Sequence, residues 1–243
     1  FVDRHGLQPT LRIGIVMACT GALLAVIWPM YPVLCVSALL TGGATGAVII
    51  ALQRHVGRMA ADTVALRSAF SWLSVGPAAS NFVGPLLAGL LIDHAGFRAA
   101  FAMMAVLPLL TWLWVRALAE RPSQAAPTAQ GPQRAWDLLR DPPLRRLLLV
   151  NWFLSSCWDV HTFMVPILGH ERGISASAIG MVLGTFALAA TLIRFSLPLV
   201  AGRFKEWQII TAAMLMTGLL LAVYPFTATA WMMGLCSGLL GLS

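Results

Sequence analysis

Three ionisable side chains lie inside long apolar runs of the chain: Asp159, His161 and Arg194. If these runs cross a membrane, a charged or titratable group within them is costly, and it is a candidate for binding a solute or an ion. A carboxylate shielded from water can take up and release a proton, or hold a cationic solute, as its surroundings change. These residue types therefore predict solute binding and proton exchange.

Asp159 and Arg194 are expected at similar depths in two predicted spans. Asp159 is twelve residues beyond Leu147, or about 18 Å along a helix. Arg194 is eight residues before Gly202, or about 12 Å from the inner end of its helix. The difference of about 6 Å is within reach of an arginine side chain, so the two can pair across a cavity. Alternatively, Arg194 extends to the cytoplasmic interface and Asp159 makes a local polar contact.

His161 is two residues from Asp159 and faces another direction on a helix, so the two do not form one constellation. We expect His161 to be hydrogen-bonded within the helical bundle, with a role in solute binding or coupling as the alternative. Asn151 and Trp158 are further candidates for a cavity wall, although tryptophan also anchors interfaces. The aromatic residues predicted as interfacial anchors near span ends are Trp28, Tyr31, Trp207 and Tyr224.

Composition indicates the solvent in which these residues act. Of the 243 residues, 59% are hydrophobic and 10% are charged, whereas a soluble domain has about 25% charged residues. So few charges cannot cover a water-soluble protein of this size, and lipid is the alternative. A net charge of +7 would favour nucleic acid in a soluble protein. Here the basic residues lie between apolar runs, so they indicate membrane topology and no nucleic-acid partner.

Eight apolar runs are candidates for crossing the hydrocarbon layer, which takes about 20 residues as a helix. Helices are predicted because the runs lack period-two alternation and because a helix satisfies its own backbone in lipid. Pro77, Pro85 and Pro166 are read as tolerated kinks. The fold class is therefore an all-α integral membrane protein, a polytopic helical bundle. The predicted spans are 13–30, 33–52, 69–92, 99–115, 147–168, 176–201, 209–226 and a truncated one from 228.

The basic residues predict the orientation. With a cytoplasmic N-terminus, thirteen of the sixteen lysines and arginines fall in inner segments, while Arg98 and Arg172 fall in outer ones and Arg194 lies within a span. Positively charged loops resist translocation, so we predict a multi-pass protein of the cell (inner) membrane with cytoplasmic arginine-rich loops. The segment 117–143 is rich in Pro, Gln and Ala, and it is predicted to be a cytoplasmic linker between halves 1–116 and 144–243.

The opening residues "FVDRHG" place Asp3, Arg4 and Gly6 directly before a predicted span. This arrangement resembles the tail of the loop motif of the major facilitator superfamily, in which an acid and basic residues lock neighbouring helices at the cytoplasmic face. The segment "LVAGRFKEW", about 200 residues later, resembles a degenerate copy that keeps Arg203. The repetition is typical of two related halves.

The span 69–92 carries the more specific pattern, "GPAASNFVGPLLAGLLIDHAGFRAAF". Small residues recur every four positions from Gly76 to Ala88, and such a row lets another helix approach closely, in this family or in any membrane protein. The segment is similar to the fifth-helix motif GxxxGPxxGG of the superfamily's antiporter branch. The motif positions are occupied by Ser80, Gly84, Pro85, Ala88 and Gly89, with serine and alanine replacing two glycines.

The resemblance implies helices three to ten of a twelve-helix fold. It further implies a secondary active transporter that moves a small solute by alternating access, with proton-coupled efflux as the first hypothesis and metabolite import as its alternative. The expected partners are the solute, protons and the lipid bilayer. Many antiporters of the family carry an arginine in the fourth helix where this chain has Leu39, which weighs against proton coupling through that span.

Other classes of function have less support. The sequence has no GxSxG or HExxH motif and no paired acids within a span, so we predict neither an enzyme nor a cofactor or metal site. A membrane scaffold without transport remains an alternative. Because the chain starts at Phe1 rather than methionine and stops within a run of small residues, we expect an internal fragment of a longer protein.

Overall fold

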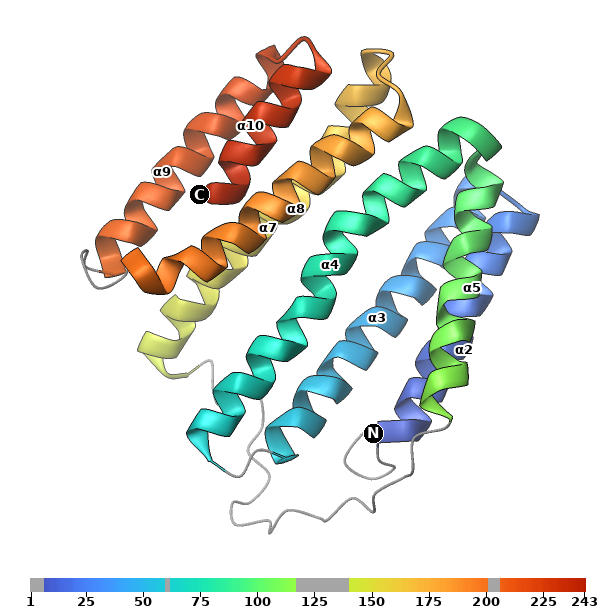
Figure 1. Cartoon of the computed structure of the whole chain (residues 1–243), viewed down its shortest axis with the longest axis horizontal. Coiled ribbons are helices and arrows are strands. Elements are labelled where there is room, and N and C mark those ends of the chain that lie inside the picture. The colour runs from blue at the N-terminus through green and yellow to red at the C-terminus, as the bar shows by residue number, and fades with distance from the viewer. Residues whose placement is uncertain (1–6, 60–61, 117–139, 201–205) are drawn as a thin grey trace. The chain divides into compact units, whose positions relative to one another are not determined.

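The structure is a computed structural model that describes residues 7–59, 62–116, 140–200 and 206–243 (Figure 1). All regular elements within these ranges are helices, which confirms the predicted all-α fold. Asp3, Arg4, Gly6 and Arg203 lie outside the described residues, as does most of the predicted linker. The elements are α2 (Leu7–Ile27), α3 (Tyr31–Met59), α4 (Thr63–Ala95), α5 (Phe97–Val115), α7 (Pro142–Glu171), α8 (Ala176–Val200), α9 (Glu206–Val223), η1 (Tyr224–Phe226) and α10 (Ala230–Leu242).

Each of the eight predicted spans overlaps one α-helix, and the span 209–226 also includes η1. Six of the described helices are long and apolar enough to cross a membrane: α2, α3, α4, α5, α8 and α9. Helix α10 is apolar but has only 13 residues. Helix α7 has 30 residues but is not among the six. Its apolar stretch contains the polar residues Asn151, Asp159 and His161, which lower its mean hydropathy. Pro77, Pro85 and Pro166 lie inside helices, as predicted.

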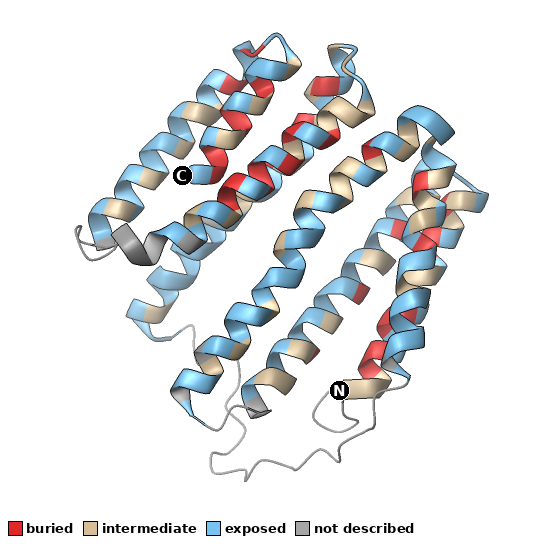
Figure 2. Cartoon of the chain, in the orientation of Figure 1, coloured by how far each residue is buried: buried red, intermediate tan, exposed pale blue. Residues whose placement is uncertain are grey.

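Much of the apolar side-chain surface faces outward. Trp72, Leu215 and Leu235 are 76%, 70% and 66% exposed, and Figure 2 shows exposed residues along all the long helices. On a soluble protein, contiguous apolar surface of this kind would promote association. In lipid it is the expected outer surface, because the hydrocarbon is as apolar as the side chains.

The chain forms two compact units, and helix α4 contributes to both. Unit 1 comprises Phe1–Gly76 and His94–Ala129, and unit 2 comprises Pro77–Asp93 and Gln130–Ser243. The predicted halves, 1–116 and 144–243, placed the whole of α4 in the first half. The second part of α4 belongs to unit 2 because it packs against α8.

In unit 1, α2 packs along both α3 and α5. Its contact surface is made of small side chains: Ala22 and Ala25 of α2 are fully buried, and Ala44 of α3 and Ala105 of α5 are almost so. The Cys19 thiol donates a hydrogen bond to the Ala105 carbonyl at 3.6 Å. Small residues let the helix backbones approach closely, which is the main source of attraction between helices in lipid.

In unit 2, α8 packs extensively against α10 and also contacts α7. The described core of this unit is built from α7, α8, η1 and α10, and consists of Val165, Val182, Tyr224, Met233 and Cys236. Helix α7 begins at Pro142, directly after Asp141, so the last two positions of the predicted linker are helical. Proline is well tolerated there because the first backbone N–H groups of a helix have no intrahelical acceptor.

Candidate functional site

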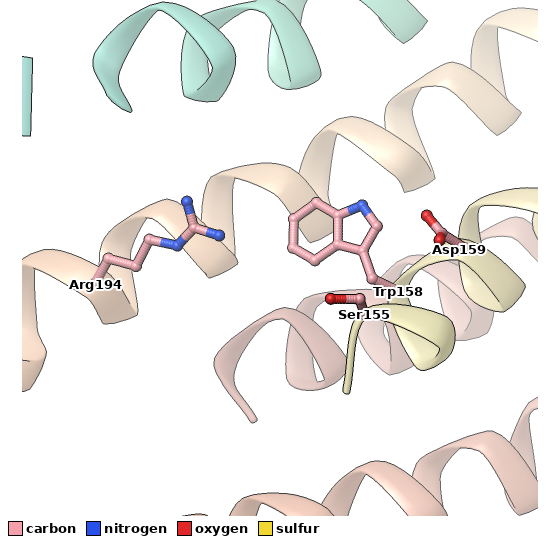
Figure 3. A pocket seen from close by; sticks show the side chains of 4 residues that line it. All are labelled: Ser155, Trp158, Asp159 and Arg194. Carbon is pink, nitrogen blue, oxygen red and sulfur yellow. The ribbon is translucent and has the colours of Figure 1, made fainter. Parts of the chain in front are cut away.

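A pocket of about 380 Å³ opens between α7 and α8 of unit 2 (Figure 3). It is lined by Ser155, Trp158, Asp159 and Arg194. Residues three and four apart share one face of a helix, so α7 presents the first three side chains together, and α8 supplies the arginine. The volume is within the range of small-molecule sites, and the lining combines an aromatic ring with groups of opposite charge.

The indole of Trp158 lies between the two charged side chains of the pocket (Figure 3). The Arg194 Cζ atom is 6.0 Å from the centre of the Trp158 ring, at the outer limit of a cation–π contact. In the described part of the pocket, no ion pair joins Asp159 to Arg194, so the pairing that we considered is not formed in this structure. Asp159 and Arg194 are both exposed.

Two residues of α7 differ from expectation at this pocket. Asn151 is exposed one turn before Ser155 and is not among the lining residues. Ser155 lines the pocket but is not among the residues predicted from the sequence. The available signal was its spacing of four residues before Asp159, which places both on one helix face.

His161 points into the core of unit 2 instead of the pocket. Its side chain is 1% exposed, and Nε2 lies 3.0 Å from the hydroxyl of Ser237 on α10. The same hydroxyl is 2.9 Å from the hydroxyl of Tyr224. This chain of hydrogen bonds agrees with the expectation that His161 bonds within the bundle. Nδ1 has no partner among the described residues, and such a buried unsatisfied atom costs about 1–3 kcal/mol.

Tyr224 was predicted to be an interfacial anchor, and that prediction is wrong. The residue is 4% exposed and contributes to the core, because the short helix η1 turns it inward toward Ser237 and His161. The other predicted anchors, Trp28, Tyr31 and Trp207, are all exposed. Nearness to a span end does not distinguish the two cases, since the direction of the side chain depends on the helix that follows.

The second part of α4 crosses the start of α8 with the two backbones in contact. A Cβ atom at Gly180 would overlap the carbonyl of Pro85. A Cβ atom at Gly89 would overlap the carbonyl of Ala176 and would lie 2.8 Å from the Cα of Ser177. Glycine is therefore needed at both positions for the helices to approach this closely.

The predicted motif residues lie in and beside this crossing. Pro85 and Gly89 form part of it, four residues apart on one face of α4. Gly76 and Gly84 have no described atom of their own unit within 4 Å of a Cβ position, while Ser80 is exposed and Ala88 is half-buried. Pro85 and Gly89, which contact α8, therefore each follow a residue of the predicted row, and they face a direction about 100° around the helix from that row.

Asp93 caps the N-terminus of α8 from the end of α4. Its Oδ1 accepts a hydrogen bond from the Ala176 N–H at 3.0 Å, and its Oδ2 accepts one from the Ser177 N–H at 2.8 Å. The first N–H groups of a helix lack intrahelical acceptors, and the helix dipole favours a negative charge there. Asp93 was not predicted to have this role, because the N–H groups that donate to it lie 83 and 84 residues further along the chain.

Comparisons with known proteins agree with this architecture. The sequence model described as Major Facilitator Superfamily matches residues 1–243. The chain is 26% identical over 213 residues to Multidrug resistance protein D of Escherichia coli strain K12, which covers 84% of this chain and 49% of that protein. It is 28% identical over 260 residues to Multidrug resistance protein MdtG of Enterobacter lignolyticus, covering 98% and 58%. For MdtG of Yersinia enterocolitica the identity is 25% over 260 residues, covering 98% and 59%.

The chain thus spans about half the length of the curated relatives that it matches. The match of the superfamily's sequence model extends over all 243 residues. The described chain is helical, and six of its helices are suited to a membrane, as that family requires. The chain therefore belongs to the Major Facilitator Superfamily.

Proposed function

We propose that the chain is part of a secondary active transporter of the cell membrane that exports a small solute by alternating access, in exchange for protons. The observation that carries this proposal is the pocket of Ser155, Trp158, Asp159 and Arg194 within helices of a membrane protein. The superfamily and the multidrug resistance names of the relatives support transport over enzymatic activity.

The pocket favours an organic cation with an aromatic ring as the solute. The Asp159 carboxylate is exposed in the pocket and offers a negative charge there. The Trp158 indole offers a flat apolar surface beside it. A cationic ring can stack on the indole while its charge faces the carboxylate, and Arg194 on the other side of the indole then limits where that charge can lie.

The crossing of α4 and α8 supports alternating access. Under the predicted topology, Asp93 and the start of α8 lie on the outer side of the membrane. Their hydrogen bonds and the backbone contacts at Gly89 and Gly180 then hold these helices together at the outer end. We infer that this contact closes the outer end of the pathway in the present conformation and separates when the pathway opens outward.

Transport of methyl viologen tests the proposal. It is an aromatic cation with two fixed charges, so it does not cross a lipid bilayer unaided. The complete protein, reconstituted in vesicles of defined orientation, should accumulate radiolabelled methyl viologen when a proton gradient is imposed. Accumulation in inside-out vesicles indicates export, and accumulation in right-side-out vesicles would replace export by import.

The variant Asp159→Asn, compared with Glu171→Gln, makes the test specific to the pocket. Loss of a charge-assisted contact should weaken methyl viologen binding roughly 10- to 100-fold in Asp159→Asn. Glu171 is exposed at the end of the same helix, and Glu171→Gln should behave as the unaltered protein. Equal transport by both variants would exclude Asp159 from the site, and no flux in the unaltered protein would refute the proposed function for this class of solute.

A further inference from the structure

His161, Ser237 and Tyr224 form a buried polar cluster that solute binding in the pocket does not use. The three residues come from α7, α10 and η1, and each is at most 4% exposed. Aromatic rings surround the imidazole: the Phe186 ring centre is 4.3 Å away, and the Tyr224 ring lies edge-on at 5.5 Å. A polar group so enclosed is expected to satisfy each of its nitrogens.

The hydrogen bonds of this cluster satisfy only one side of the imidazole. Nε2 faces the Ser237 hydroxyl, and that hydroxyl faces Tyr224. Nδ1 is the buried side-chain nitrogen or oxygen atom that has no partner in the described structure. When Nε2–H donates to Ser237 and Ser237 donates to Tyr224, the lone pair of Nδ1 is left free. The imidazole can then accept a proton at Nδ1 without rearranging the bonds on its other side.

We propose that His161 is the site that binds the transported proton, with Ser237 and Tyr224 as the acceptor chain that holds its Nε2–H. The inference rests on the proposed transport function and adds the residue that couples it to protons. In the step itself, a proton from water that reaches the site forms the Nδ1–H bond. The same bond breaks when the proton returns to water on the opposite side, so atoms and charge balance over one cycle.

Phe186 packs against both this histidine and a residue of the pocket wall. Its ring centre is 4.5 Å from that of Trp158, which lines the pocket, and 4.3 Å from that of His161. The ring itself is 4% exposed. A solute that displaces the Trp158 indole therefore acts on a side chain that packs against His161. In the proposed mechanism, movement of Phe186 admits water to Nδ1, which makes access of the proton dependent on the state of the pocket.

The ionisable groups around His161 are few. Tyr224 and Cys236 belong to the same core, and the Cys236 thiol donates to the Leu220 carbonyl. Asp159 lies two residues away on α7 but is exposed in the pocket. At the end of α7, Arg172 donates to the Thr227 hydroxyl and the Pro225 carbonyl, and so fixes the segment that carries Tyr224.

The variant His161→Gln tests the assignment, because glutamine keeps hydrogen-bonding atoms near Ser237 but does not take up a proton. The complete protein in vesicles is assayed in two ways with methyl viologen: accumulation driven by a proton gradient, and exchange of labelled for unlabelled solute at equal pH. Accumulation should fall at least about tenfold, whereas exchange should stay within about twofold, because only the first requires a titrating group. His170→Gln, at an exposed residue of the same helix, should change neither.

The outcomes separate this inference from the proposed function. Retained gradient-driven accumulation in His161→Gln, or equal loss of accumulation and exchange, overturns the proton site. Absence of exchange in the unaltered protein overturns the transport function itself. If His161→Gln does not fold, modification by diethyl pyrocarbonate decides the question, since that reagent reacts with accessible neutral imidazole. His161 should become reactive in Phe186→Ala and react progressively less as pH falls; reactivity that is independent of pH, or absent, would overturn the proposal.

Discussion

Replacing Gly89 by alanine should separate α4 from α8, and the neighbouring Gly84 provides the matched control. Both glycines lie inside α4, five residues apart. A Cβ atom at Gly89 would overlap the Ala176 carbonyl and would lie 2.8 Å from Cα of Ser177, whereas one at Gly84 meets no described atom of its unit within 4 Å. The atoms at Gly89 are backbone atoms, so a change of side-chain rotamer cannot relieve the overlap.

The comparison of the two variants isolates the cost of that overlap. Alanine favours a helix over glycine by about 1 kcal/mol at either position, so this gain cancels in the difference. Overpacking of a close contact costs about 1–3 kcal/mol. We therefore expect the free energy of unfolding of Gly89→Ala to be about 1–3 kcal/mol lower than that of Gly84→Ala. Because the gain in helix propensity offsets part of the overlap, the value for Gly89→Ala should lie within about 2 kcal/mol of that for the unaltered protein.

Equilibrium unfolding of the complete protein in mixed detergent micelles measures this difference. The Asp93 bonds to Ala176 and Ser177 lie beside the same contact, so a labelled cysteine at position 177 should also become more accessible in Gly89→Ala than in Gly84→Ala. Equal stability of the two variants, together with equal labelling, would refute the conclusion that the crossing depends on backbone contact.

Three further predictions concern single side chains. Asp93→Ala should lower the free energy of unfolding by about 0.5–2 kcal/mol, and Asp93→Asn by less because one acceptor remains; equal values for the two variants would contradict the cap at Ala176 and Ser177. Ser237→Ala should cost about 1–3 kcal/mol, because His161 and Tyr224 both lose a buried partner, and the exposed Ser196→Ala on α8 should cost much less in the same unfolding measurement. Trp158→Ala should weaken methyl viologen binding by about 0.5–2 kcal/mol, or roughly 2- to 30-fold in equilibrium dialysis; an unchanged affinity would remove the indole from the binding surface.

The helices could be predicted from sequence because the solvent imposes them. Apolar runs of about 20 residues have few ways to satisfy their backbone in lipid, so length and composition alone locate the spans. The proline at position 85 did not mislead this reading, since it lies within α4 as predicted. The boundary between units was harder to foresee. It falls inside α4 because part of that helix packs on α8, and such a tertiary contact leaves no signal in composition.

The site was predictable only in part. An ionisable residue within a span is conspicuous, and Asp159 and Arg194 do line one pocket. Successive residues of a helix are turned by about 100°, so a shift of one residue changes the neighbour that a side chain faces. Gly89 contacts α8, whereas the row of small residues predicted from the sequence ends at Ala88. Similarly, nothing near Tyr224 in the sequence indicated that its hydroxyl would meet that of Ser237.

Helix α8 connects the three features on which the proposals rest. Its first turns meet α4 at Ala176 and Gly180, its middle places Phe186 against His161, and its later part carries Arg194 to the pocket. These positions span about 27 Å of one hydrogen-bonded helix. Because a continuous helix moves largely as a body, separation from α4 at its start would shift Phe186 and Arg194 in the same event. In the proposed mechanism, opening of the outer contact, uncovering of His161 and reshaping of the pocket are consequences of one displacement, as coupling of solute movement to proton movement would require.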